Sequence, residues 1–157
     1  MTQVRADDGA ESNHPTVENN FTDSLRCTGF GFILPQSVTI NGIVARVKCV
    51  HDTAGAVNPR IRKIMLIKGG TWSSTEKEVD TAVAQGSYTT VNPGSASDLW
   101  GLTFTKAQIE ASDFGVGVQF ICDTGGGGTA FGVDYISITV HYTIIATGAA
   151  AAAFALL

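Results

Sequence analysis

The side chains best suited to metal binding or acid–base chemistry are three histidines, His14, His51 and His141. No two of them have the HxH or HExxH spacing that brings two imidazoles to one metal ion. His14 lies in a polar N-terminal segment, His51 in an expected turn, and His141 on the polar face of an expected strand. We therefore expect three surface histidines and no metal site.

Carboxylates form the second group that could carry chemistry, since a glycosidase needs an opposed pair and calcium binding needs several. Most of them stand beside Gly, Ser or Thr in expected turns, where Asp commonly hydrogen-bonds its own backbone. No DxDxDG calcium loop is present, and a catalytic pair built from distant residues stays open as a weaker alternative. The group includes Asp7, Asp8, Asp52, Glu76, Glu78, Asp80, Asp98, Glu110, Asp113, Asp123 and Asp134.

Cysteines and glycine-rich runs also lack the motifs of nucleophilic or phosphate chemistry. Three cysteines, Cys27, Cys49 and Cys122, form no CxxC pair, so we expect reduced thiols and neither a disulfide framework nor a zinc site. Cys49 falls on the apolar face of an expected strand, which predicts a buried and inert thiol. There is no GxSxG, and residues 125–128 lack the Lys-Ser/Thr and helix of a P-loop. The sequence therefore predicts no enzyme and no cofactor.

Two tryptophans could form a sugar-stacking platform together with Tyr88. Trp100 shares the face of an expected strand with Leu102 and Phe104, which favours core packing. Trp72 follows a glycine pair in an expected loop. It is therefore the better candidate for an exposed contact with a partner.

The elements that must position these residues read as short strands. Apolar residues alternate with polar ones through residues 43–49, 61–68 and 136–142, and turn signals separate the runs. A capping box at Thr105 predicts one helical turn over residues 106–111. The pattern excludes parallel βαβ architectures and predicts an all-β antiparallel sandwich, with a jelly-roll slightly favoured over an immunoglobulin-like topology. Further strands are expected over residues 26–33, 100–104 and 116–122, and weaker strand signals cover residues 79–83 and 87–91.

Composition places the chain among single-domain globular proteins. It has 157 residues, of which 44% are hydrophobic, only 15% are charged and 18 are glycines. The formal net charge is -4, and the basic residues are scattered apart from a small cluster at residues 60–63. Since nucleic-acid binding needs a basic stripe, we expect no nucleic-acid partner.

Two terminal segments flank a domain that we expect at residues 21–143. Residues 1–20 are polar and lack both a strand period and the apolar core of a signal peptide. Residues 144–157 form an Ala-rich apolar tail, shorter than the roughly 20 residues needed to span a bilayer. We therefore expect an extended N-terminal arm, no membrane anchor, and a tail that docks on its own sandwich or on a neighbouring molecule. The candidate partner-binding residues are Ile144, Ile145, Phe154, Leu156 and Leu157 of the tail, together with Trp72.

Several strand and turn segments share a pattern with known structural modules. They are Thr28-Gly29-Phe30-Gly31-Phe32-Ile33-Leu34-Pro35, Val38-Thr39-Ile40-Asn41-Gly42-Ile43, Leu66-Ile67-Lys68-Gly69-Gly70, Asp98-Leu99-Trp100-Gly101-Leu102-Thr103, Asp113-Phe114-Gly115-Val116 and the closing Val133–Tyr142. Through these segments, residues 24–143 resemble the β-sandwich modules of tailed-bacteriophage virion proteins, which occur on heads, tails and fibres. The resemblance carries no catalytic signature and does not extend to the terminal segments.

The resemblance and the terminal segments together predict a virion structural protein that is made in the host cytoplasm. The first hypothesis is a capsid decoration or cement protein that binds across capsid subunit junctions as a homo-oligomer, with a trimer favoured. Its partners would be the major capsid protein or other virion proteins. The alternative is a carbohydrate- or receptor-binding module of a tail or head fibre, in which Trp72 and Tyr88 would contact the ligand. A hydrolase and a surface-filament subunit are weaker hypotheses.

Overall fold

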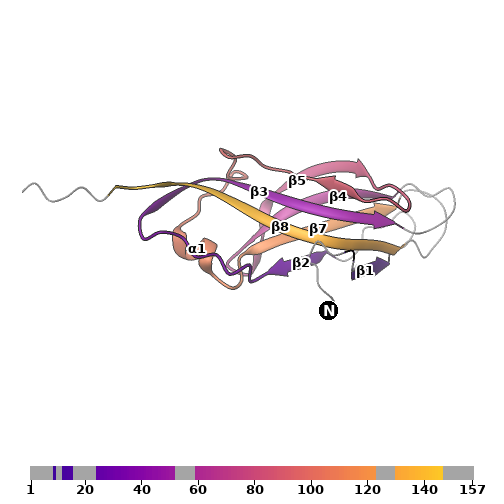
Figure 1. Ribbon diagram of the computed structural model, residues 1–157, viewed down its shortest axis with the longest axis horizontal. Coiled ribbons are helices and arrows are strands. Elements are labelled where there is room, and N and C mark those ends of the chain that lie inside the picture. The colour runs from indigo at the N-terminus through magenta and orange to yellow at the C-terminus, as the bar shows by residue number, and fades with distance from the viewer. Residues whose placement is uncertain (1–8, 10–11, 16–23, 52–58, 123–129, 147–157) are drawn as a thin grey trace, which may run out of the picture.

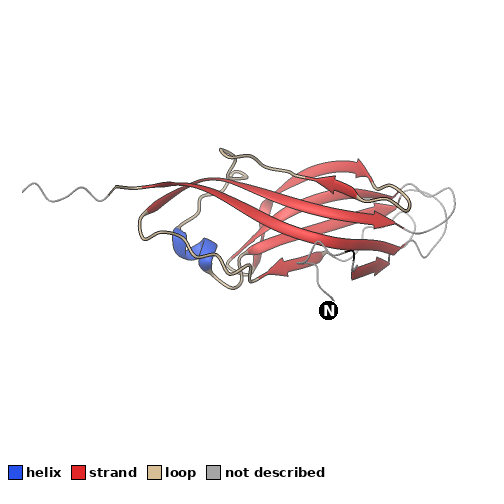
Figure 2. Ribbon diagram, viewed as in Figure 1, coloured by secondary structure: helices blue, strands red, loops and turns tan. Residues whose placement is uncertain are grey.

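The computed structural model describes residues 9, 12–15, 24–51, 59–122 and 130–146. They form two four-stranded antiparallel sheets that pack face to face, with one short helix, α1 (Lys106–Glu110), at one end (Figure 1, Figure 2). The all-β antiparallel sandwich predicted from the alternating strands is therefore confirmed.

Sheet A contains the longest strands and has the order β1–β8–β3–β6. The bounds are Ser12–Pro15 for β1, Ala130–Ile144 for β8, Val38–His51 for β3 and Thr89–Val91 for β6. β3 and β8 pair along their length, from Val38 opposite Ile144 to His51 opposite Phe131. The two strands make a ribbon that extends beyond α1 at one end of the sandwich (Figure 1).

Sheet B has the order β2–β7–β4–β5. The packing of β7 against its neighbours requires glycine at two positions. A Cβ on Gly115 would stand 1.9 Å from the carbonyl oxygen of Cys27 on the neighbouring strand, and one on Gly117 would stand 1.6 Å from the Trp72 ring. Larger residues in β7 would therefore push its neighbours away. The bounds are Leu25–Thr28 for β2, Gly115–Cys122 for β7, Pro59–Lys68 for β4 and Thr71–Ala82 for β5.

Alternating side chains from both sheets fill the space between them. Phe120 of β7 and Phe131 of β8 stack across the two sheets with their ring centroids 4.4 Å apart. Both rings are fully buried, so they join the sheets at the centre of the core. The buried cluster also contains Ile43, Ala45, Val47, Ile61, Ile64, Leu66, Val116, Val118, Val133 and Ile136.

The strand expected over residues 26–33 ends at Thr28, so this prediction is wrong for its second half. Gly29 and Gly31 have φ angles of 69° and 70°, and such left-handed values break the pleat of a strand. The intervening aromatic residues, Phe30 and Phe32, pack against the core from the resulting loop. In this segment the glycines therefore allow the chain to form a loop, and the phenylalanines attach that loop to the core.

The loop after β6 closes one side of the sandwich, and residues 100–104 within it form no strand, against expectation. Trp100 has a φ of 58° in a turn, and its buried indole N–H donates a hydrogen bond of 2.9 Å to the carbonyl oxygen of Ile43 on β3. Asp98 accepts bonds from the Trp100 backbone N–H at 2.7 Å and from Nζ of Lys77 on β5 at 2.6 Å. This loop therefore links sheet A to sheet B, and the predicted core position of Trp100 is confirmed.

The helical turn predicted from the capping box is confirmed as α1. The Thr105 hydroxyl accepts a hydrogen bond from the Gln108 backbone N–H at 3.3 Å. The Gln108 side chain accepts one in return from the Thr105 backbone N–H at 3.0 Å. These reciprocal bonds satisfy N–H groups that a helix start leaves without intrahelical partners.

The sandwich takes residues from both terminal segments. β1 lies inside the segment expected as an extended arm, and it pairs Ser12 with Val133 and Pro15 with Ala130. β8 continues to Ile144, and the Ile145 backbone N–H donates to the carbonyl oxygen of Ser37 at 2.9 Å. The pairing therefore reaches beyond the range 21–143 on both sides.

Candidate functional site

Three isoleucines expose more than half of their surface. Two lie at the end of the β3–β8 ribbon, and the third lies in the loop that leads into it. The exposed fractions are 92% for Ile33, 62% for Ile144 and 52% for Ile145. Ile33 lies in the loop between β2 and β3, Ile144 is the last residue of β8, and Ile145 follows it. Since burying an isoleucine stabilises by about 1.5–3 kcal/mol, this exposure suits a surface that a partner covers. We call Ile33, Ile144 and Ile145 the apolar end.

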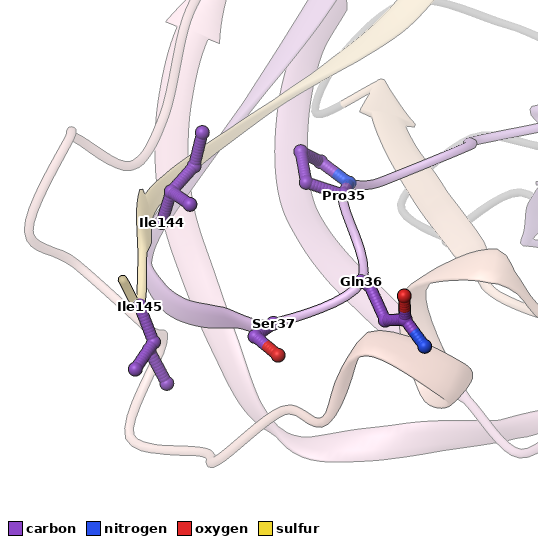
Figure 3. Close-up of a pocket in the computed structure, with 5 residues that line it drawn as sticks. All are labelled: Pro35, Gln36, Ser37, Ile144 and Ile145. Carbon is purple, nitrogen blue, oxygen red and sulfur yellow. The ribbon is translucent and has the colours of Figure 1, made fainter. Parts of the chain in front are cut away.

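A hollow of about 410 Å³ lies beside the apolar end, between the loop and the last residues of the ribbon. Pro35, Gln36 and Ser37 line one side, and Ile144 and Ile145 line the other (Figure 3). The two isoleucine side chains point to opposite faces of the strand, as expected for consecutive residues in extended backbone (Figure 3). The bond from the Ile145 N–H to the Ser37 carbonyl oxygen holds the loop and the ribbon together.

α1 anchors the loop that carries Ile33. The Glu110 carboxylate accepts a 2.7 Å hydrogen bond from the Leu34 backbone N–H, and it pairs with Lys106 one helical turn earlier. The bond from Leu34, and next the bond from Lys106, lower the pKa of Glu110 below its usual value. Leu34 is buried while its neighbour Ile33 is exposed, so the anchored loop presents Ile33 to solvent.

The structure therefore brings together two of the predicted partner-binding residues, Ile144 and Ile145, beside the hollow, and shows Ile33 as a further exposed isoleucine in the loop that leads into β3. Ile33 could not be predicted because its segment was expected to be a strand with alternating faces. Phe154, Leu156 and Leu157, the remaining tail candidates, lie outside the described residues. Whether any of these residues contacts a partner stays a prediction.

Trp72 lies in β5 and not in a loop, which corrects the expected position. Its ring lies over Gly117 of β7, and the Arg26 guanidinium carbon is 4.9 Å from the ring centroid. Arg26 also donates a 2.5 Å hydrogen bond to the Gly70 carbonyl oxygen, which holds it in place. Since Gly117 and Arg26 both contact the ring, Trp72 is poorly placed to stack on a sugar.

A buried charge cluster on sheet A was not predicted. Asp134 of β8 is fully buried, and its two carboxylate oxygens contact Lys48 Nζ at 2.7 Å and the Gly9 backbone N–H at 2.9 Å. The Lys48 ammonium also lies 4.1 Å from the centroid of the Tyr88 ring. Asp134 occupies a β-bulge, because Lys48 pairs with Tyr135 while Cys49 pairs with Val133. The cluster could not be predicted from the sequence, because its members are far apart in the chain and Asp134 lies in a bulge that interrupts the strand alternation.

The side chains first considered for chemistry have mostly structural surroundings. His51 ends β3 and is buried, so the expectation of a surface position is wrong for this residue; His141 is partly exposed. The three cysteines are free thiols, as predicted, and burial raises the pKa of Cys49 to about 12. Across the described ranges, no three His, Cys, Asp or Glu residues come close enough together to hold a metal ion. Within those ranges the chain also has no helix with the length and hydropathy of a membrane span.

Comparison with protein-family models, with curated proteins and with solved structures finds no match to the chain.

Proposed function

We propose that the chain is a virion structural protein that binds neighbouring subunits through the apolar end, most specifically a capsid decoration protein seated over capsid subunit junctions. The observation that carries the proposal is the exposure of Ile33, Ile144 and Ile145, in contrast to the core residues between the sheets, which are buried. The resemblance of the strand and turn segments supplies the virion setting.

The position of the apolar end supports a role in assembly. β8 leads directly into the Ala-rich segment that continues to Phe154, Leu156 and Leu157. Apolar residues that follow an apolar surface add to the area that a partner can bury. Each Å² of apolar surface removed from water stabilises a complex by roughly 25 cal/mol. These residues are therefore further candidates for contact with the same partner.

The receptor-binding alternative is supported by the exposure of Tyr88, one of its two expected contacts. Tyr88 is 41% exposed beside β6, and Lys48 lies over its ring. Trp72, the other expected contact, is covered by Arg26. A single ring gives a smaller stacking surface than two, so we place this function second.

The proposal is tested on virus particles purified from the source of this chain. We expect the protein in the particles, with its density over capsid subunit junctions and the apolar end facing the shell. Absence from purified particles would contradict the virion setting, and density confined to the tail would contradict the capsid role.

A variant pair tests which surface makes the contact. Ile144→Ser with Ile145→Ser should weaken binding to particles at least about tenfold, because two half-exposed isoleucines lose about 1.4 kcal/mol or more of burial. Tyr88→Ser, at an exposed ring beside β6, is the matched control and should bind like the wild type. Loss of particle binding in the Tyr88 variant alone would contradict the apolar end as the contact surface.

A further inference from the structure

One long strand edge of the sandwich has no partner strand among the described residues. β8 pairs with β3 on one side along its length, but on its other side β1 covers only Ala130–Val133. Among the residues that the structure describes, no strand pairs with this second side from Tyr135 to Ile144. An unpaired edge presents a row of backbone donors and acceptors to any strand that arrives.

The sequence of this edge lacks the features that normally prevent edge pairing. Natural edge strands carry lysine, proline, inward-pointing charges or bulges that block a second strand. The segment Tyr-Ile-Ser-Ile-Thr-Val-His-Tyr-Thr-Ile at residues 135–144 contains no proline, glycine, lysine, arginine or carboxylate. The bulge at Asp134 lies before this segment, at the point where the pairing with β1 ends.

We propose that the Tyr135–Ile144 edge pairs with the same edge of a second copy of this chain, so that two A sheets join antiparallel about a twofold axis. Directly opposite residues of antiparallel strands share a face, so the pairing must align apolar with apolar positions. Centring it on Val140 does so, because Ile138 then faces Tyr142 and Ile136 faces Ile144 of the second copy. The outward face brings Thr139 opposite His141 and no like charges together.

The match of apolar positions when the edge is paired with itself supports a second copy over an unrelated strand. With Val140 opposite Val140, the pairing uses the edge from Ile136 to Ile144 in each copy and ends just short of β1. The same edge already accepts a strand from a distant part of the chain, since β1 pairs with it at Ser12–Pro15. The pairing would cover Tyr142 and Ile144, exposed by 40% and 62%, and would leave Ile33 and Ile145 of the apolar end outside the paired edge for another partner.

This inference goes beyond the proposed function and does not depend on a virion setting. The first test is the molar mass of the full chain by light scattering over a concentration series. We expect the mass to approach twice 16.4 kDa. Thr139→Lys with His141→Lys places lysines opposite each other across the twofold axis and should raise the dimer dissociation constant roughly tenfold or more. Ser74→Lys, at an exposed serine on β5, the edge strand of the other sheet, is the matched control and should stay dimeric.

The second test fixes the register. Opposed residues of antiparallel strands have Cα atoms about 4.5–5.5 Å apart, within the range of a disulfide. Val140→Cys should therefore form a disulfide-linked dimer on mild oxidation, whereas Ser74→Cys and the wild type, with its own free thiols, should not.

A wild type that stays monomeric, or a double-lysine variant that keeps the wild-type mass, would overturn the inference. A trimeric mass would also overturn it, because a twofold edge pairing closes at two copies. Particle binding measured with the double-lysine variant separates the two proposals. A monomeric variant that still binds particles leaves the proposed function intact, and a dimeric wild type that binds no particles leaves the edge pairing intact.

Discussion

The Asp134 carboxylate shows how one side chain can organise a sheet surface. Burying a charge is costly unless the charge is paired and hydrogen-bonded. Asp134 is completely buried, but Lys48 and the Gly9 backbone each contact one of its oxygens. Gly9 precedes β1, so the carboxylate also ties the start of the described chain to the sheet.

Lys48→Met should destabilise the fold by about 3 kcal/mol, because it leaves a fully buried carboxylate without its cation. The free energy of unfolding from urea titration measures this change. Lys63→Met is the matched control, since Lys63 pairs with the more exposed Glu76 on sheet B. That pair should contribute no more than about 1 kcal/mol. Equal losses of unfolding free energy in the two variants would show that the buried pair stabilises the fold no more than the exposed pair does.

At the scale of single elements, the outer face of sheet B depends on a small residue beneath a large one. Trp72 of β5 reaches across β4 to cover Gly117 of β7. Ile67, opposite Trp72 in the β4–β5 pair, is fully buried although it is absent from the core cluster between the sheets. Trp72 thus contributes to a second apolar layer on the outside of the sheet.

Gly117→Ala should displace the Trp72 ring, because the new Cβ would stand 1.6 Å from it. We expect a loss of about 1–3 kcal/mol in stability, with a red shift in the fluorescence that Trp72 contributes. Gln119→Ala, two residues along the same strand, is the control and should leave the fluorescence unchanged. Combining Gly117→Ala with Trp72→Ala should cost less than the two single losses added together. Additive losses would contradict the contact.

The elements that could be predicted from the sequence are those whose signal is local. β3, β4 and β8 follow from two-residue alternation, and α1 follows from the Thr105–Gln108 box, because each pattern lies within one element. The loop at Gly29–Gly31 and the turn at Trp100 could not be predicted, since alternating apolar residues there are combined with left-handed backbone. For the candidate site, apolarity indicated Ile144 and Ile145 as candidates, and the structure shows that both are exposed, whereas the exposure of Ile33 depends on α1 holding Leu34 from a distant segment.

At the scale of the whole molecule, the loop around Asp98 holds the two sheets together along one side. Its carboxylate contacts Lys77 of sheet B, and its neighbour Trp100 bonds to β3 of sheet A. The hydrogen bond from Lys77, followed by the bond from the Trp100 backbone, lowers the pKa of Asp98. The link between the sheets is therefore strongest when Asp98 is ionised.

Acidification should weaken this link. Because the pKa of folded Asp98 lies below the unfolded value of about 3.9, its contribution is complete above that pH and is lost as the pH falls through the folded pKa. Asp98→Asn should therefore be less stable than the wild type at pH 7, and the difference should shrink below about pH 4. Urea unfolding at both pH values measures it. Ser97→Ala, an uncharged neighbour, is the control, and a pH-independent deficit in Asp98→Asn would refute the role of ionisation.

The position of β8 inside sheet A has a consequence for how the chain is made. β8 is the last strand in the described sequence, yet it lies between β1 and β3 and pairs with residues more than a hundred positions earlier. On the ribosome, sheet A cannot close until this strand has left the exit tunnel. Until then, the edge of β3 that pairs with β8 has no partner strand. Such high contact order places folding in the millisecond-to-second range, after β8 has been synthesised.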